Sequence, residues 1–165
     1  MFGEKIKIYN GAVFLETQFC VAFVNIKPIV QGRNNCNTKT FLLFKFKWIF
    51  FVIDIVIIPK KLRLRVEEMS PEETADLFTV ARHIGAKLEK HYNGTALNFG
   101  IQDGLDAGQS VRHVHLHILP RRPGDFKKDE VYEKLENHDK DESVKGRSNQ
   151  EMNAEAAVLR MLFYS

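Results

Sequence analysis

Three histidines, His113, His115 and His117, alternate with apolar residues in one short segment of the chain. On an extended backbone, successive side chains point to opposite faces, so the three imidazoles are predicted to share one face. Positions two residues apart are about 6.6 Å from each other at a rise of about 3.3 Å per residue, so neighbouring rings can reach one bound phosphate group. The spacing therefore predicts a site of phosphate chemistry.

Two other interpretations of the histidine segment are open. A single histidine on such a strand is usually a surface residue, but three in strict alternation weaken that interpretation. Imidazoles are also common zinc ligands, and two of them can bind metal from one strand. A closed zinc site would need another well-placed ligand, and zinc retained through dialysis would favour this alternative.

The segments around the histidines predict helices. Ser70 is placed as an N-cap, Pro71 follows it, and Glu73 can close a capping box. Apolar residues then recur at helical spacing until a stop at Asn93 and Gly94. A second helical pattern covers 151–162, and the charged stretch 140–150 before it is predicted to be a mobile loop.

Strand patterns accompany these helices. Residues 13–15 and 20–25 are rich in β-branched and aromatic side chains, and residues 97–102 alternate between apolar and polar before a turn. The histidine segment is expected to form the next strand, within 108–125. These patterns predict one α+β domain over 1–165, with a mainly antiparallel sheet of about five strands and two helices.

The composition is that of a single-domain protein of 165 residues. The formal net charge of +3 is spread along the chain, so we expect no nucleic-acid groove. Cys20 and Cys36 form no CxxC motif, and the N-terminus lacks the features of a secretion signal. These features predict a reducing location, cytoplasmic or nuclear.

The stretch 41–58 is almost continuously apolar and about as long as a short membrane span. It contains Lys45, Lys47 and Asp54, and each charge would cost about 2.5–3.5 kcal/mol at the centre of a membrane helix. We therefore expect no association with a membrane.

The run from His113 to Leu119 resembles the defining motif of the histidine-triad superfamily. Further similarities to the fragile histidine triad branch extend over the whole chain except about residues 33–54. They are Phe2-Gly3, 23–28, 102–104, 107–111, 120–121, 124–126, Tyr132 and the alanine-rich helix near the C-terminus. The resemblance implies the histidine-triad fold, a homodimer, and hydrolysis of diadenosine triphosphate to AMP and ADP.

The resemblance also implies a role for each histidine. His115 is the nucleophile: its neutral imidazole attacks the α-phosphorus, and water then cleaves the nucleotidyl-histidine. His117 matches the histidine that contacts the bridging oxygen and eases departure of the leaving phosphate. His113 would help to hold the phosphate and the arrangement of the rings.

The remaining predicted contacts bind substrate through uncharged groups. Such donors stabilise phosphoryl charge without an ion pair strong enough to retain the product. The residues matched to phosphate or ribose contacts are Asn25, Gln102, Gly108, Gln109, Ser110 and Val111, with Lys5 standing where the family often has a histidine. Taken one at a time, Asn25 and the two glutamines are equally well interpreted as turn or surface residues. No protein-held metal is implied, although a divalent cation, Mg²⁺ or Mn²⁺, would arrive with the substrate.

Residues 33–54 depart from the resemblance as an apolar insertion in the single domain. In the family, the chain continues from Gln31-Gly32 through a histidine directly into a strand like 55–59. The inserted block is rich in Asn, Lys, Phe and Ile, which have AT-rich codons. We interpret it as a translated intron, because with CGT for Arg33 and GAT or GAC for Asp54, splicing would leave a histidine codon. The insertion is expected to be adverse for folding and activity.

Two other functions remain open at this point. One is a phosphoramidate or aminoacyl-adenylate hydrolase of the related histidine-triad branch, in which the chain usually ends soon after the motif. The extended tail 121–165 argues against it. The other is a nucleotide-binding or signalling module that has lost turnover through the insertion. Binding of a nonhydrolysable dinucleotide without turnover would identify such a module.

Overall fold

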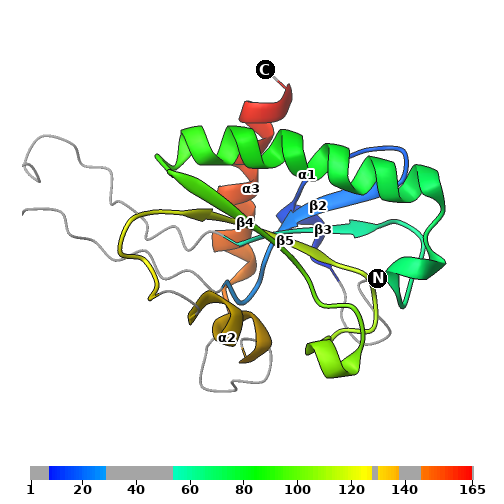
Figure 1. Cartoon of the computed structure of the whole chain (residues 1–165). Helices are drawn as coiled ribbons and strands as arrows, with labels where there is room; N and C mark the ends of the chain where they lie inside the picture. Colours follow the sequence, from blue (N-terminus) through cyan, green and yellow to red (C-terminus); the bar gives the residue numbers. More distant parts are fainter. Residues whose placement is uncertain (1–7, 29–53, 128–129, 138–145, 165) are drawn as a thin grey trace, which may run out of the picture.

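The computed structural model describes residues 8–28, 54–127, 130–137 and 146–164. Within them, five strands form one antiparallel sheet in the order β1-β2-β3-β5-β4 (Figure 1). The strands are β1 (Val13–Glu16), β2 (Cys20–Val24), β3 (Ile55–Pro59), β4 (Ala96–Ile101) and β5 (Leu116–Arg121). The predicted α+β class and five-stranded sheet are confirmed.

Within the described residues, three α-helices accompany the sheet, one more than predicted. They are α1 (Pro71–His91), α2 (Glu130–Asn137) and α3 (Asn149–Tyr164). Short 3-10 helices are η1 (Asn10–Ala12), η2 (Val66–Glu68) and η3 (Leu105–Ala107). None of the helices in these described ranges is long and apolar enough to cross a membrane.

Helix α1 begins where its capping residues predict. The Ser70 hydroxyl accepts from the backbone N–H of Glu73 at 3.2 Å, and the Glu73 carboxylate accepts from the N–H of Ser70 at 2.8 Å. The two bonds satisfy amide groups that a helix start leaves without an intrahelical partner. The helix ends at His91, just before Asn93 takes a left-handed conformation with φ of 52°.

Different helices pack on the two faces of the sheet. The apolar side of α1 and part of α3 share one core cluster with Leu116 and Ile118 of β5. Leu119, one residue further along β5, instead joins Val131 and Leu135 of α2. In Figure 1, α1 accordingly lies above the sheet and α2 below it. Since alternate residues of a strand share a face, His117 lies on the same side of β5 as Leu119.

The histidine strand is shorter than predicted, so this expectation was wrong in its extent. Strand β5 begins at Leu116, and His113 and His115 precede it. Pairing of β5 with both neighbouring strands starts at Leu116, which lies opposite Ile57 of β3 and Ile101 of β4. Strand β3 ends at Pro59, which has no N–H to continue a ladder, and β4 ends at Ile101.

Two predicted segments, the insertion 33–54 and the loop 140–150, overlap the described residues only at their ends, and α3 shortens the second. Asp54, the last residue of the predicted insertion, directly precedes β3, and its carbonyl accepts from the N–H of Asn25 at 3.0 Å, next to the Val24–Ile55 pair. Helix α3 begins at Asn149, inside the predicted loop 140–150. The rest of the insertion, 33–53, and loop residues 140–145 lie outside the described ranges.

Candidate active site

The ring of His115 is buried and held by the backbone of its own triad. Its Nδ1 lies 2.6 Å from the carbonyl oxygen of His113, and the side chain is 2% exposed. Because a carbonyl oxygen only accepts hydrogen bonds, Nδ1 must carry the proton of the ring. The other nitrogen, Nε2, then holds the lone pair whenever the ring has a single proton. This arrangement prepares Nε2 of His115 to act as a nucleophile.

His117 lies beside His115 and contacts a buried carboxylate. The two rings meet edge to face, with centroids 5.3 Å apart. Nδ1 of His117 lies 2.9 Å from Oδ1 of Asp54, which is fully buried. The second oxygen of Asp54 accepts from the Asn25 amide at 2.8 Å. Sequence reasoning missed Asp54 as a site residue, although a charge directly before a buried strand was a signal for it.

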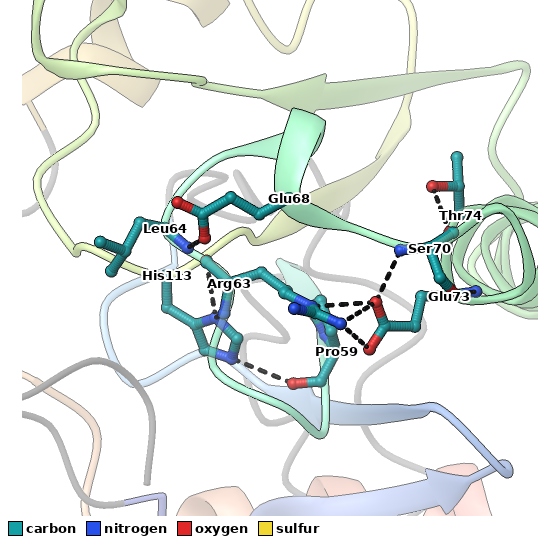
Figure 2. Close-up of polar contacts among 8 residues, drawn as sticks. All are labelled: Pro59, Arg63, Leu64, Glu68, Ser70, Glu73, Thr74 and His113. Carbon is teal, nitrogen blue, oxygen red and sulfur yellow. Dashed lines mark hydrogen bonds and ion pairs between the residues drawn. The ribbon is translucent and has the colours of Figure 1, made fainter.

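The ring of His113 faces a loop between β3 and α1 (Figure 2). Its Nε2 is 3.0 Å from the carbonyl oxygen of Pro59, and its Nδ1 lies near both the N–H of Arg63, at 3.2 Å, and the Arg63 carbonyl oxygen, at 3.1 Å. A single proton on Nε2 satisfies the contacts with the Pro59 carbonyl and the Arg63 N–H. His113 therefore supports the site by anchoring this loop and by holding His115 through its carbonyl. A contact of its ring with phosphate stays a prediction.

An ion pair ties the same loop to the start of α1. The Arg63 guanidinium donates to both carboxylate oxygens of Glu73, at 2.9 and 3.1 Å, and Glu73 also accepts from Ser70 in the capping box (Figure 2). Burial would raise the pKa of Glu73, but the Ser70 N–H and the Arg63 charge outweigh it and hold that pKa below its ordinary value. A helix start thus fixes the loop that holds His113.

A cavity of about 420 Å³ opens beside His117 and is bordered by β4, η3 and α2. Its lining residues are Asn98, Phe99, Gly100, Ile101, Gln102, Asp106, Ala107, His117, Tyr132 and Leu135. It therefore brings together two predicted site residues, His117 and Gln102. The Oε1 atom of Gln102 is buried and has no hydrogen-bond partner among the residues described. This oxygen is thus available to accept a hydrogen bond from a bound molecule.

The other predicted binding residues form the loop before the triad. Gln109 is buried: its amide donates to the Leu64 carbonyl at 3.0 Å and accepts from Gly104 N–H at 3.0 Å, so its side chain shapes the loop. Gly108 is left-handed, with φ of 86°, Ser110 is exposed and Val111 half-buried. Lys5 lies outside the described residues.

Asn25 is held from the C-terminal side of the chain by Arg147. The Arg147 guanidinium donates to the Asn25 carbonyl at 3.0 Å and pairs with buried Glu155, which also accepts from the hydroxyl of Tyr92. Burial raises the pKa of Glu155 against the opposing effect of Arg147. Arg147 lies outside regular secondary structure in the predicted loop 140–150, whose mobility stays a prediction. The pattern of charges before α3 did not reveal which of them is buried.

Metal binding was one interpretation of the histidines. Across the described ranges, no group of three or more His, Cys, Asp or Glu side chains is arranged to hold a metal ion. In the triad itself, Nδ1 of His115 and Nδ1 of His117 each already face an oxygen acceptor. The Nδ1 atoms of both rings are therefore engaged in hydrogen bonds.

Known proteins are similar to this chain in sequence and fold. A family model described as a HIT domain matches residues 52–124. The bis(5'-adenosyl)-triphosphatase of Dictyostelium discoideum is 34% identical over 157 residues, covering 94% of this chain and 88% of that protein. The bifunctional bis(5'-adenosyl)-triphosphatase/adenylylsulfatase of Arabidopsis thaliana is 36% identical over 166 residues, covering 95% and 81%. The chain belongs to the histidine-triad family.

A larger protein shares the same fold in one portion of its length. The nitrilase and fragile histidine triad fusion protein of Caenorhabditis elegans is 42% identical over 150 residues, which are 91% of this chain and 29% of the fusion protein. The crystal structure of that NitFhit protein aligns with a TM-score of 0.71 at 35% identity, over 99% of this chain and 30% of that one. This histidine-triad chain spans less than a third of that protein.

Proposed function

We propose that this chain hydrolyses diadenosine triphosphate to AMP and ADP. The hydrogen bond from Nδ1 of His115 to the His113 carbonyl carries the proposal, because it leaves Nε2 as the nucleophile. The Dictyostelium relative, which this chain matches over most of both lengths, is named bis(5'-adenosyl)-triphosphatase. The nearby cavity, with Gln102 and His117 in its wall, supplies room for part of such a substrate.

The reaction proceeds in two displacements. Nε2 of His115 forms a bond to the α-phosphorus as the bond to the bridging oxygen breaks, and the electron pair leaves with ADP. His117, next to His115, supplies a proton to the departing oxygen when that oxygen needs one. Water then attacks the nucleotidyl-histidine, the N–P bond breaks back to His115, and the proton of the water passes to His117. The products are AMP and ADP.

The test is release of AMP and ADP from diadenosine triphosphate by the purified chain. His115→Ala is expected to abolish turnover, whereas His83→Ala, a histidine of α1 that packs against Phe163, is the matched control and should retain it. A single turnover quenched in alkaline denaturant, which preserves the acid-labile N–P bond, should leave label from the α-phosphate on the wild-type protein. Turnover by folded His115→Ala would reject the assignment of His115, and the hydrolase assignment fails if neither the folded full chain nor a folded variant without 34–54 that carries Arg33→His turns over substrate.

The insertion and its origin belong to the same proposal. We propose that residues 33–54 interrupt the hydrolase domain and derive from an intron. Sequencing the transcript across codons 32–56 tests the origin, because a message that only retains the block contradicts it. A variant that lacks 34–54 and carries Arg33→His tests the effect on function. Faster turnover by this variant than by the full chain would identify the block as disabling.

We also propose a homodimer that works with a divalent cation delivered by its substrate, in the cytoplasm or nucleus. Strand β4 lies at one edge of the sheet and leaves Phe99 46% exposed, and such an edge is suited to pairing with a second chain. Light scattering should give twice the monomer mass. Chelation should slow turnover, and added Mg²⁺ or Mn²⁺ should restore it. A monomeric mass would reject the homodimer. Turnover that chelation does not change would reject the need for a divalent cation.

A further inference from the structure

We infer that Asp54 is a positioning residue that orients His117 and keeps it ready to donate a proton. The inference deepens the proposed hydrolase function, on whose chemistry it rests. Asp54 is fully buried, and each of its carboxylate oxygens accepts from one side chain: Oδ1 faces Nδ1 of His117 at 2.9 Å, and Oδ2 faces the amide of Asn25 at 2.8 Å. The resemblance places a histidine here, so this contact is particular to the present chain.

The geometry fixes which nitrogen of His117 does the chemistry. A carboxylate can only accept, so the proton shared with Asp54 lies on Nδ1 of His117. Nε2 is then the nitrogen left for the substrate, and His117 lines the cavity. In the other tautomer, Nδ1 would direct a lone pair at a carboxylate, which is repulsive. Asp54 therefore selects one ring orientation and one tautomer.

The charge of Asp54 adds a second effect. A carboxylate removed from water is costly unless it is paired and hydrogen-bonded. The His117 ring, 2% exposed, is the cationic partner within hydrogen-bond distance once it takes up a second proton. Within the described part of the chain, the His115 ring lies 5.3 Å from that of His117, and Arg147 with Glu155 lies behind Asn25. Asp54 thus favours the protonated His117 that a leaving oxygen requires.

The neighbouring contacts keep Asp54 in place. Its backbone carbonyl accepts from the N–H of Asn25 at 3.0 Å, and the Asn25 carbonyl is held by Arg147. Asp54 is therefore held directly before β3 by its own backbone bond to Asn25 and by the contact of Asn25 with Arg147. This rigidity is what a residue that sets the orientation of another requires.

Two substitutions separate orientation from charge. Asp54→Asn keeps an oxygen that can accept from Nδ1 of His117 but removes the charge, whereas Asp54→Ala removes both. Asp76→Asn is the matched control, because Asp76 is a carboxylate of α1 that accepts from Thr17 on the other side of the sheet. Circular dichroism and thermal unfolding establish that each variant is folded.

The first readout needs no activity. In protein labelled with ¹⁵N-histidine, the Nδ1–H of His117 should give a low-field proton signal protected from exchange in the wild-type chain and in Asp76→Asn. The signal should shift in Asp54→Asn and disappear in Asp54→Ala. An unchanged His117 signal in folded Asp54→Ala would overturn the inference, whether or not the chain hydrolyses diadenosine triphosphate.

The second readout is kinetic. Loss of a group that orients a catalytic side chain costs about 10–100-fold, so kcat should fall by that factor in Asp54→Ala, with KM changed less than about threefold. In Asp54→Asn the alkaline limb of the kcat profile should move to lower pH, because His117 loses its proton more easily. A raised KM with unchanged kcat, or a profile identical to wild type, would overturn the inference.

Discussion

Replacing Glu73 by alanine should loosen the loop between β3 and α1, whose Arg63 contacts His113. The carboxylate joins three parts of the site: it closes the capping box of α1 through Ser70, it pairs with Arg63, and Arg63 donates its backbone N–H to His113. Removing it leaves a guanidinium that is 18% exposed without its counter-charge, and a helix start without one of its caps. Both stability and turnover should suffer.

The size of the effect follows from these contacts. Breaking a buried ion pair by removing one partner costs about 3–5 kcal/mol, and loss of a cap costs about 1 kcal/mol. Because water can reach part of Arg63, the lower part of this range applies. We expect Glu73→Ala to lower the free energy of unfolding by about 3 kcal/mol. In a double-mutant cycle with Arg63→Ala, the coupling energy should be about 1–2 kcal/mol.

Urea unfolding at neutral pH measures these energies, and Glu72→Ala is the matched control because Glu72 is an exposed carboxylate in the same first turn. The pKa of Glu73 is lowered in the folded state, so its contribution is complete above the ordinary pKa of a glutamate and is lost as the pH falls through the lowered value. Glu73→Gln should therefore lose less stability than the wild type on acidification. A cost below about 1 kcal/mol for Glu73→Ala, or no coupling to Arg63, would refute the reasoning.

Three further predictions concern other parts of the chain. Burial raises the pKa of the Cys20 thiol to about 12, so maleimide at pH 8 should label it only after unfolding, and mass spectrometry of its peptide measures this; rapid labelling of the native chain would contradict it. Gly104 has φ of 107°, so Gly104→Ala should cost about 1–3 kcal/mol in urea unfolding, and a neutral effect would show that the turn relaxes. Leu119 is fully buried against α2, so Leu119→Ala should cost about 2–4 kcal/mol and speed amide exchange in α2; unchanged exchange there would separate α2 from this core.

The sequence by itself determined the elements whose signals are local. Ser70 and Glu73 mark the start of α1 because a capping box needs only residues three apart, and the alternation around the histidines indicates an extended segment with imidazoles on one side. The motif identified the family for a similar reason, since its chemistry requires closely spaced rings. These features depend on neighbours in the chain, which a sequence displays directly.

The tertiary structure decided which distant residues complete the site. Asp54 and His117 are 63 positions apart, and they meet because β3 pairs with β5 in a particular register. His113 lies outside β5 because both neighbouring strands stop pairing at Leu116. Arg147 reaches Asn25 across 122 positions for the same kind of reason. Sheet order and strand length are set by packing of the whole core, so residue types and local spacing could not specify these contacts.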